Sequence, residues 1–185
     1  QLTKDPGNAA LLLQHLDGWA GSLAYDAFRD VVQWVRPGPA LPGFTPPRPG
    51  DALADHHALY VHHWLAKRRG VSFAAQSVSD AILSAARAHT VHPLQAYLTA
   101  LAWDGVPRVA TWLQHYLGAT DDAYTTHVGV WWLVAAVARA LAPGCQADHV
   151  VIFEGVQGSG KSSAVRALAG DWYLGALPDL RSKDA

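Results

Sequence analysis

The chain has 185 residues, 50% of them hydrophobic, and its 14 lysines and arginines nearly balance its 15 aspartates and glutamates. This length and apolar content suit one domain, or one and a half, with a buried core. The formal net charge of -1 excludes a strongly basic protein held to nucleic acid or to an acidic membrane by its overall charge, although a local patch could still bind DNA.

The residue inventory also bears on location and completeness. The single cysteine, Cys145, excludes an internal disulfide bond and favours a reducing cytoplasm. No signal peptide is visible, because no basic stretch precedes an apolar one at the N-terminus. The longest apolar run, "VGVWWLVAAVARALAP", meets Arg139 before it reaches the ~18 residues of a membrane span, and it predicts a buried helix. Because the chain has no methionine and begins with Gln1, we expect it to be a fragment.

A small α/β segment is predicted at residues 1–35, followed by a linker. "NAALLLQHLD" begins with Asn8, a good N-cap, and predicts a short helix that ends at Gly18. In "SLAYDAFRDVVQWV" the strand-forming residues flank Arg29–Asp30, which predicts a hairpin. Residues 36–51, "RPGPALPGFTPPRPGD", are too rich in proline and glycine for a helix or a central strand, and they predict a mobile linker without core contacts.

Residues 52–145 are predicted to form a helical module. The first helix, "DALADHHALYVHHWLAKRRG", closes with basic residues and a glycine, a typical C-terminus. The second, "SVSDAILSAARAH", has Ser77 or Ser79 as its N-cap, and Pro93 opens a third, "PLQAYLTALAW". "RVATWLQHYLG" is expected to start just after Pro107, and "DDAYTTHVGVWWLVAAVARALAPG" is predicted to be the longest and most apolar helix.

Three groups in this module could carry chemistry, and each has a structural interpretation that we favour. The histidines of "HHALYVHH" lack the i,i+3 or i,i+4 spacing of metal ligands on one helix, which favours a partly exposed helix. The basic cluster Lys67–Arg69 suits a helix C-terminus, with a DNA phosphate contact as the alternative. Four tryptophans are expected in the core rather than as base-stacking platforms: Trp103, Trp112, Trp131 and Trp132.

Residues 146–185 are predicted to begin a domain with a parallel sheet. "DHVVIFEG" predicts a buried strand over Val150–Phe153, and a helix is predicted over Ser162–Leu168, before Gly170. Between them, "GVQGSGKS" fits G-x-x-x-x-G-K-[ST], the Walker A pattern of phosphate-binding loops, in the strand–loop–helix context that the pattern requires. The whole chain is therefore predicted to be α/β and mostly helical.

The motif supplies the groups that a nucleoside triphosphate needs. Its glycines let backbone N–H groups point inward, and the next helix adds free N–H groups and the positive end of its dipole. Lys161 provides a charge for the β- and γ-phosphates, and the Ser162 hydroxyl is a natural Mg²⁺ ligand. We therefore expect ATP and Mg²⁺ as ligands and Lys161 as the catalytic residue. The expected nucleotide contacts are Gly155, Gln157, Gly158, Ser159, Gly160, Lys161, Ser162 and Ser163.

Two stretches resemble the virulence-associated protein E family: "HPLQAYLTALAWDGVPRVATWLQHYLGA" and "GVQGSGKSSAVRALAGDWYLGALPDLRSKDA". The resemblance covers His92–Ala185, while Asn8–His89 shares only the general layout. These proteins are encoded by phages and mobile elements, are similar to superfamily 3 replicative helicases, and are often attached to a primase. The family's nucleotide-binding loop corresponds to Gly155, Gly160, Lys161 and Ser162. The "WDGVPR" turn, Trp103–Arg108, matches the family pattern but has no chemical role that we can assign.

The resemblance implies a helicase-like ATPase that acts on DNA in phage or mobile-element replication. It implies single- or double-stranded DNA, a primase domain and further copies in a ring as partners, a bacterial or phage-infected cytoplasm, and no membrane. The family's acidic strand motif and its arginine for the γ-phosphate are expected after Ala185, so we expect the full-length protein to hydrolyse ATP and this chain alone to be inactive.

Two alternatives to this function stay open. Another P-loop enzyme, such as a kinase, fits the motif, although a long helical module before the loop disfavours it. A non-catalytic module could instead dock DNA or a primase through its N-terminal region, with a vestigial loop. The intact Lys161 and Ser162 argue against a loop that has lost its function.

Overall fold

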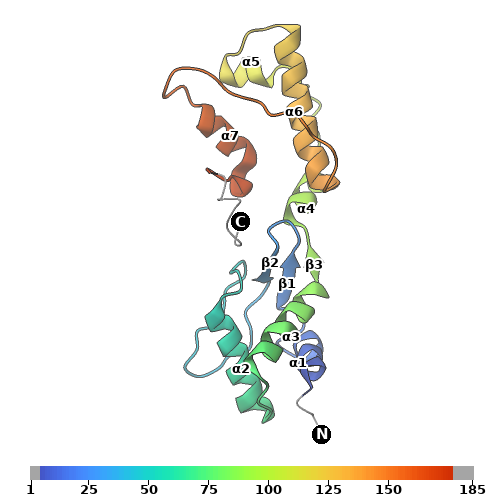
Figure 1. Ribbon diagram of the computed structural model, residues 1–185, viewed down its shortest axis with the longest axis vertical. Helices are drawn as coiled ribbons and strands as arrows, with labels where there is room; N and C mark the ends of the chain where they lie inside the picture. Colours follow the sequence, from blue (N-terminus) through green and yellow to red (C-terminus); the bar gives the residue numbers. More distant parts are fainter. Residues whose placement is uncertain (1–4, 177–185) are drawn as a thin grey trace. The chain divides into compact units, whose positions relative to one another are not determined.

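The computed structural model describes residues 5–176 and divides the chain into two compact units, Gln1–Pro93 and Leu94–Ala185. The outer ends of the predicted segments 1–35 and 146–185 lie outside the described residues. The described part is mixed α/β, about 48% helical, with a small three-stranded sheet (Figure 1). The unit boundary at Pro93 divides the range 52–145, which was predicted as one helical module.

The sheet of the first unit contains the predicted hairpin. Strand β1, Leu23–Asp26, pairs antiparallel with β2, Val31–Trp34, and Asp30 takes a positive φ of 56° in the turn between them. A third strand, β3, Thr90–Val91, pairs parallel with β1 and gives the order β2-β1-β3. No sequence signal predicted β3, because two residues are too few to show an alternating pattern.

Three helices build the rest of the first unit: α1, Pro6–His15; α2, Asp55–Arg69; and α3, Ala75–Arg87. Helix α3 packs on β1, and both α1 and α2 pack on α3 (Figure 1). At the centre, the ring centroids of Trp19 and Trp34 lie 6.0 Å apart, and those of Trp19 and Trp64 lie 5.3 Å apart. This aromatic cluster provides the apolar core that the composition predicted.

Two predicted helix starts in this unit are wrong. Asp5, not Asn8, caps α1, because its carboxylate accepts a hydrogen bond from the Gly7 N–H at 2.7 Å. Helix α3 starts at Ala75 after Ala74, so neither Ser77 nor Ser79 is its cap. Ser79 lies inside the helix and its hydroxyl donates to the Ala75 carbonyl oxygen. The predicted end of α2 is confirmed, since Gly70 takes the left-handed conformation that closes a helix.

The segment 36–51 is not the contact-free linker that its composition predicted. Leu41 is only 3% exposed and belongs to the core, and the rings of Phe44 and Tyr60 lie 6.1 Å apart. The Tyr60 hydroxyl also donates a hydrogen bond to the Pro39 carbonyl oxygen. As predicted, the segment forms no helix or strand. Proline and glycine prevent ladder hydrogen bonding, but they do not stop the apolar side chains between them from packing.

Over its described residues, the second unit contains helices joined by loops and no strand of its own. It contains α4, Pro93–Ala100; α5, Trp112–Leu117; α6, Ala123–Leu141; α7, Lys161–Ala169; and the short 3₁₀ helix η1, Gly170–Trp172. Asp122 caps α6 by accepting from the Thr125 N–H at 2.7 Å, and α5 contacts both α6 and α7. Helix α5 starts at Trp112 rather than just after Pro107, because a separate turn occupies residues 103–108.

Three further predictions for this unit are wrong. Val150–Phe153 is not a buried strand: it pairs with no strand, and Val150 and Ile152 are 87% and 79% exposed. A strand needs a hydrogen-bonded neighbour, and residues 94–176 contain no other strand that could pair with it. Helix α6 is not buried either, since its only buried residues are Gly129 and Ala140. Trp131 on α6 and Trp103 in the turn before α5, both predicted to lie in the core, are 66% and 78% exposed. Between residues 5 and 176, no helix has both the length and the apolarity of a membrane span.

Candidate phosphate-binding loop

An aromatic cluster fixes the point where the chain enters the loop. The rings of Trp112 and Trp132 are stacked with their centroids 5.4 Å apart, and the Phe153 ring packs edge-on against both. The Trp112 indole N–H donates to the Gly129 carbonyl oxygen at 3.0 Å, which ties α5 to α6 beneath this cluster. Phe153 therefore anchors the residues before the loop although they form no strand.

The loop itself is a tight turn that leads directly into α7. The Ser159 N–H donates to the Val156 carbonyl oxygen at 3.3 Å, which closes the turn. Gly160 is the N-cap of α7 and has a φ of 85°, in the left-handed region that a side chain disfavours. The sequence thus provides a glycine where the backbone must reverse before the helix begins.

The Lys161 side chain folds back over the loop. Its Nζ donates to the Gly155 carbonyl oxygen at 2.8 Å, to the Val156 carbonyl oxygen at 2.9 Å and to the Ser159 hydroxyl at 3.1 Å. A Cβ atom at Gly155 would lie 3.8 Å from this Nζ, so the ammonium closely approaches the backbone there. The loop therefore encloses one positive charge.

The start of α7 adds donors beside this charge. Lys161, Ser162 and Ser163 occupy its first turn, where N–H groups have no earlier carbonyl of the helix to bond. Both serines are exposed, and the helix dipole makes this end positive. From Gly155 to Gly170 the sequence has two cations, Lys161 and Arg166, and no carboxylate. This donor set fits a polyphosphate, since hydroxyl, ammonium and N–H groups all suit anionic oxygens.

All eight residues that the motif predicted as nucleotide contacts lie in this loop or in the first turn of α7. The sequence pattern did not predict the part played by Val156, whose main-chain oxygen holds Lys161. A main-chain contact depends on no particular side chain, so the residue type gives no signal for it. Farther along α7, the Arg166 guanidinium lies 5.0 Å from the centre of the Tyr173 ring, a cation–π contact.

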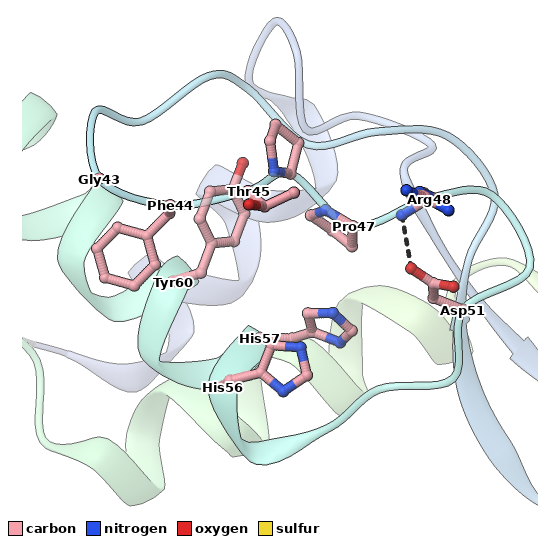
Figure 2. A pocket seen from close by; sticks show the side chains of 10 residues that line it. Gly43, Phe44, Thr45, Pro47, Arg48, Asp51, His56, His57 and Tyr60 are labelled. Atoms are coloured by element: carbon pink, nitrogen blue, oxygen red, sulfur yellow. Dashed lines mark hydrogen bonds between the residues drawn. The ribbon is translucent and has the colours of Figure 1, made fainter.

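A pocket in the first unit, of about 300 Å³, lies between the segment 43–51 and the start of α2 (Figure 2). Asp51 in its wall accepts a hydrogen bond from the Arg48 N–H at 2.7 Å, which Figure 2 shows as a dashed line. Tyr60 points its hydroxyl to the Pro39 carbonyl oxygen, and burial raises the pKa of Tyr60 to about 12. These lining groups thus serve the packing of the segment.

The histidines beside this pocket also serve the fold. Burial, together with the neighbouring His56, lowers the pKa of His57, while Asp51 acts weakly in the opposite direction. His57 is 6% exposed, and its Nδ1 accepts from the Ala54 N–H at 3.2 Å. Among residues 5–176, no three or more histidine, cysteine, aspartate or glutamate side chains are grouped to hold a metal ion.

The "WDGVPR" residues form an ordered, exposed turn in the second unit. Arg108 binds Asp104 through two parallel hydrogen bonds, and Asp104 also accepts from the Val106 N–H at 3.0 Å. These bonds, with the Arg108 hydrogen bond first, lower the pKa of Asp104 to about 2. The Trp103 indole N–H donates to the Val106 carbonyl oxygen at 3.2 Å. The motif therefore has a structural role that its sequence did not reveal.

Comparison with known families finds a match in the second half of the chain. The family model of the virulence-associated protein E-like domain matches residues 98–185. This range includes the ordered turn, α5, α6, the loop and α7, and it confirms the family that the two sequence stretches resemble. No curated protein matches the chain.

Proposed function

We propose that the loop 155–160 and the first turn of α7, which lie within the match to the virulence-associated protein E-like domain, bind the triphosphate of Mg²⁺–ATP. The chain is then the ATP-binding part of a helicase-like ATPase in the replication of phage or mobile-element DNA. Its partners are DNA, a primase domain and further copies in a ring, in the cytoplasm. The nucleotide site rests on this chain's own residues, and the DNA and helicase role rests on family resemblance.

One observation carries the proposal: the Lys161 ammonium is held within 3.1 Å of three loop oxygens, at the N-terminus of α7. A cation held between a glycine-rich turn and free helical N–H groups is the arrangement that a phosphate chain requires. A chance glycine–lysine turn would not need to direct the lysine back into its own loop.

Each group would then have a distinct part. The N–H groups of the loop and of the first turn of α7 would hold phosphate oxygens, and Lys161 would pair with the negative charge that builds up during phosphoryl transfer. The Ser162 hydroxyl would be a ligand of Mg²⁺, which neutralises phosphate charge when bound. Gln157 and Ser163, both exposed at this site, would border the same phosphates.

The first test is binding. A fluorescent ATP analogue with Mg²⁺ should saturate the chain, and Lys161→Ala should weaken its affinity by roughly 30-fold or more, about 2 kcal/mol, because a charge-assisted contact is lost. Arg139→Ala, which removes an exposed cation from the last turn of α6, is the matched control and should bind normally. Equal affinity of Lys161→Ala and wild type would exclude the loop as the site.

The second test concerns the partner. In a protein with the complete ATPase domain, phosphate release should rise when single-stranded DNA is added, as a helicase-like ATPase requires. If the rate of ATP turnover did not change with DNA but depended on a small phosphoryl acceptor, the kinase alternative would replace the proposal.

A further inference from the structure

The Lys161 ammonium is fully satisfied by its own loop. An ammonium group has three N–H donors, and Lys161 Nζ has three acceptors: the carbonyl oxygens of Gly155 and Val156 and the hydroxyl of Ser159. A phosphate can therefore gain a hydrogen bond from Lys161 only when one of these acceptors gives up its own. The three acceptors differ in whether they can form a new hydrogen bond with the phosphate after they release Lys161.

The two carbonyl oxygens can only accept hydrogen bonds. If one of them releases Lys161 inside an occupied loop, it faces phosphate oxygens, which are acceptors too, so the phosphate cannot replace the hydrogen bond that this carbonyl oxygen loses. The Ser159 hydroxyl both accepts and donates, and it turns by rotation of a single torsion. It is the acceptor of the three that can release the lysine and then donate its own proton to the phosphate.

The local geometry suits this rotation. The Ser159 backbone is fixed, because its N–H bonds to the Val156 carbonyl oxygen at 3.3 Å, so the hydroxyl can turn while the main chain stays in place. Ser159 is exposed, and a Cβ atom at Gly155 would lie 3.5 Å from its Oγ. The absence of a side chain at Gly155 thus leaves space beside the hydroxyl that turns.

We infer that Ser159 is a positioning residue whose hydroxyl exchanges roles: it accepts a hydrogen bond from Lys161, as in this structure, and donates one to a phosphate oxygen when a polyphosphate binds. The exchange frees one N–H of Lys161 for the phosphates while the two carbonyl oxygens keep theirs. This inference rests on the proposed function, because it requires that the loop bind a polyphosphate.

Calorimetric titration of the chain with Mg²⁺–ATP and with inorganic tripolyphosphate tests the exchange. Ser159→Ala should weaken both ligands by about tenfold, because the phosphate loses one donor. Ser159→Thr keeps the hydroxyl and should bind within about twofold of wild type. The control is Ser79→Ala on α3, whose exposed hydroxyl bonds to the Ala75 carbonyl oxygen, and it should match wild type. Equal losses for the two ligands would identify the phosphate chain as the partner of the hydroxyl.

The outcomes separate this inference from the proposed function. If Lys161→Ala loses binding while Ser159→Ala keeps wild-type affinity, the loop binds phosphate but the hydroxyl exchange is wrong. If Ser159→Thr binds as weakly as Ser159→Ala, size rather than the hydroxyl matters, and the exchange is again wrong. If the wild-type chain binds neither ligand, both proposals fail. Melting curves of each variant show whether it is folded.

Discussion

The Arg108 guanidinium forms a bidentate pair of hydrogen bonds with the Asp104 carboxylate: Nη1 donates to Oδ1 at 2.9 Å and Nη2 donates to Oδ2 at 2.8 Å. Such a paired contact fixes direction as well as distance, so the four-residue spacing of the two side chains holds the turn in one shape. Both side chains are about half exposed, so solvent screens the pair. Its effect is to order the turn that presents Trp103, rather than to stabilise the whole unit.

The Asp104 pair should break at acid pH. The pKa of Asp104 falls from 3.8 to about 2 in the folded chain, so its contribution is complete above pH 3.8 and is lost as the pH falls toward 2. NMR titration of the Asp104 side-chain carboxyl should give a midpoint near 2. Arg108→Gln should raise it toward 3.8, while Asp122, whose pKa is lowered by the Thr125 N–H, should not move. A wild-type midpoint near 3.8 would contradict the pairing.

Lys161→Arg should only partly restore what Lys161→Ala loses. Three acceptors within 3.1 Å enclose a compact ammonium, and the larger planar guanidinium cannot bond to the same three atoms. We expect affinity for a fluorescent ATP analogue between those of wild type and Lys161→Ala. Wild-type affinity in the arginine variant would mean that charge alone suffices and that the enclosure of the ammonium is irrelevant.

Gly160→Ala tests the turn before α7 against a matched glycine. Gly160 and Gly144 have φ values of 85° and 87°, and a Cβ at either would meet nothing within 4 Å. Each alanine substitution should cost about 1 kcal/mol of stability, because both force a side chain into the left-handed region. Only Gly160→Ala should also weaken ATP binding. If both variants bound ATP alike, the backbone at Gly160 would have no part in the site.

Leu41→Ala should show that the proline-rich segment belongs to the core. Leu41 is 3% exposed, and its truncation should lower the free energy of unfolding by about 2–4 kcal/mol. Leu11→Ala, at a site that is 53% exposed on α1, should cost clearly less. Urea denaturation measures both. A loss at Leu41 no greater than that at Leu11 would restore the interpretation of residues 36–51 as a linker.

Signals carried by neighbouring residues predicted the fold best. The turn at Arg29–Asp30 and the glycine that ends α2 act within a few residues, so the sequence shows them directly. The Walker A pattern is also one continuous stretch, so the sequence alone names the loop residues, and their role in nucleotide binding stays a prediction. Two failures depended on distant partners: β3 exists because β1 lies beside it, and Val150–Phe153 lacks a neighbouring strand among the described residues.

The first unit should lose stability on mild acidification through His57. This imidazole is 6% exposed, lies against the Trp34 ring, and has its pKa lowered from 6.5 by burial and by His56 despite the opposing charge of Asp51. Below pH 6.5, His57 is therefore protonated in the unfolded chain but still neutral in the folded chain. The contribution of His57 to the free energy of unfolding is present above pH 6.5 and is lost as the pH falls toward the lowered pKa of the folded state. The melting temperature should drop as the pH falls below 6.5, and His57→Gln should have a shallower pH dependence from a lower starting point. His115→Gln, on α5 of the other unit, should leave the pH dependence of the first unit as it is in wild type. An equal slope in wild type and His57→Gln would mean that the buried imidazole takes up its proton as readily in the folded chain as in the unfolded one.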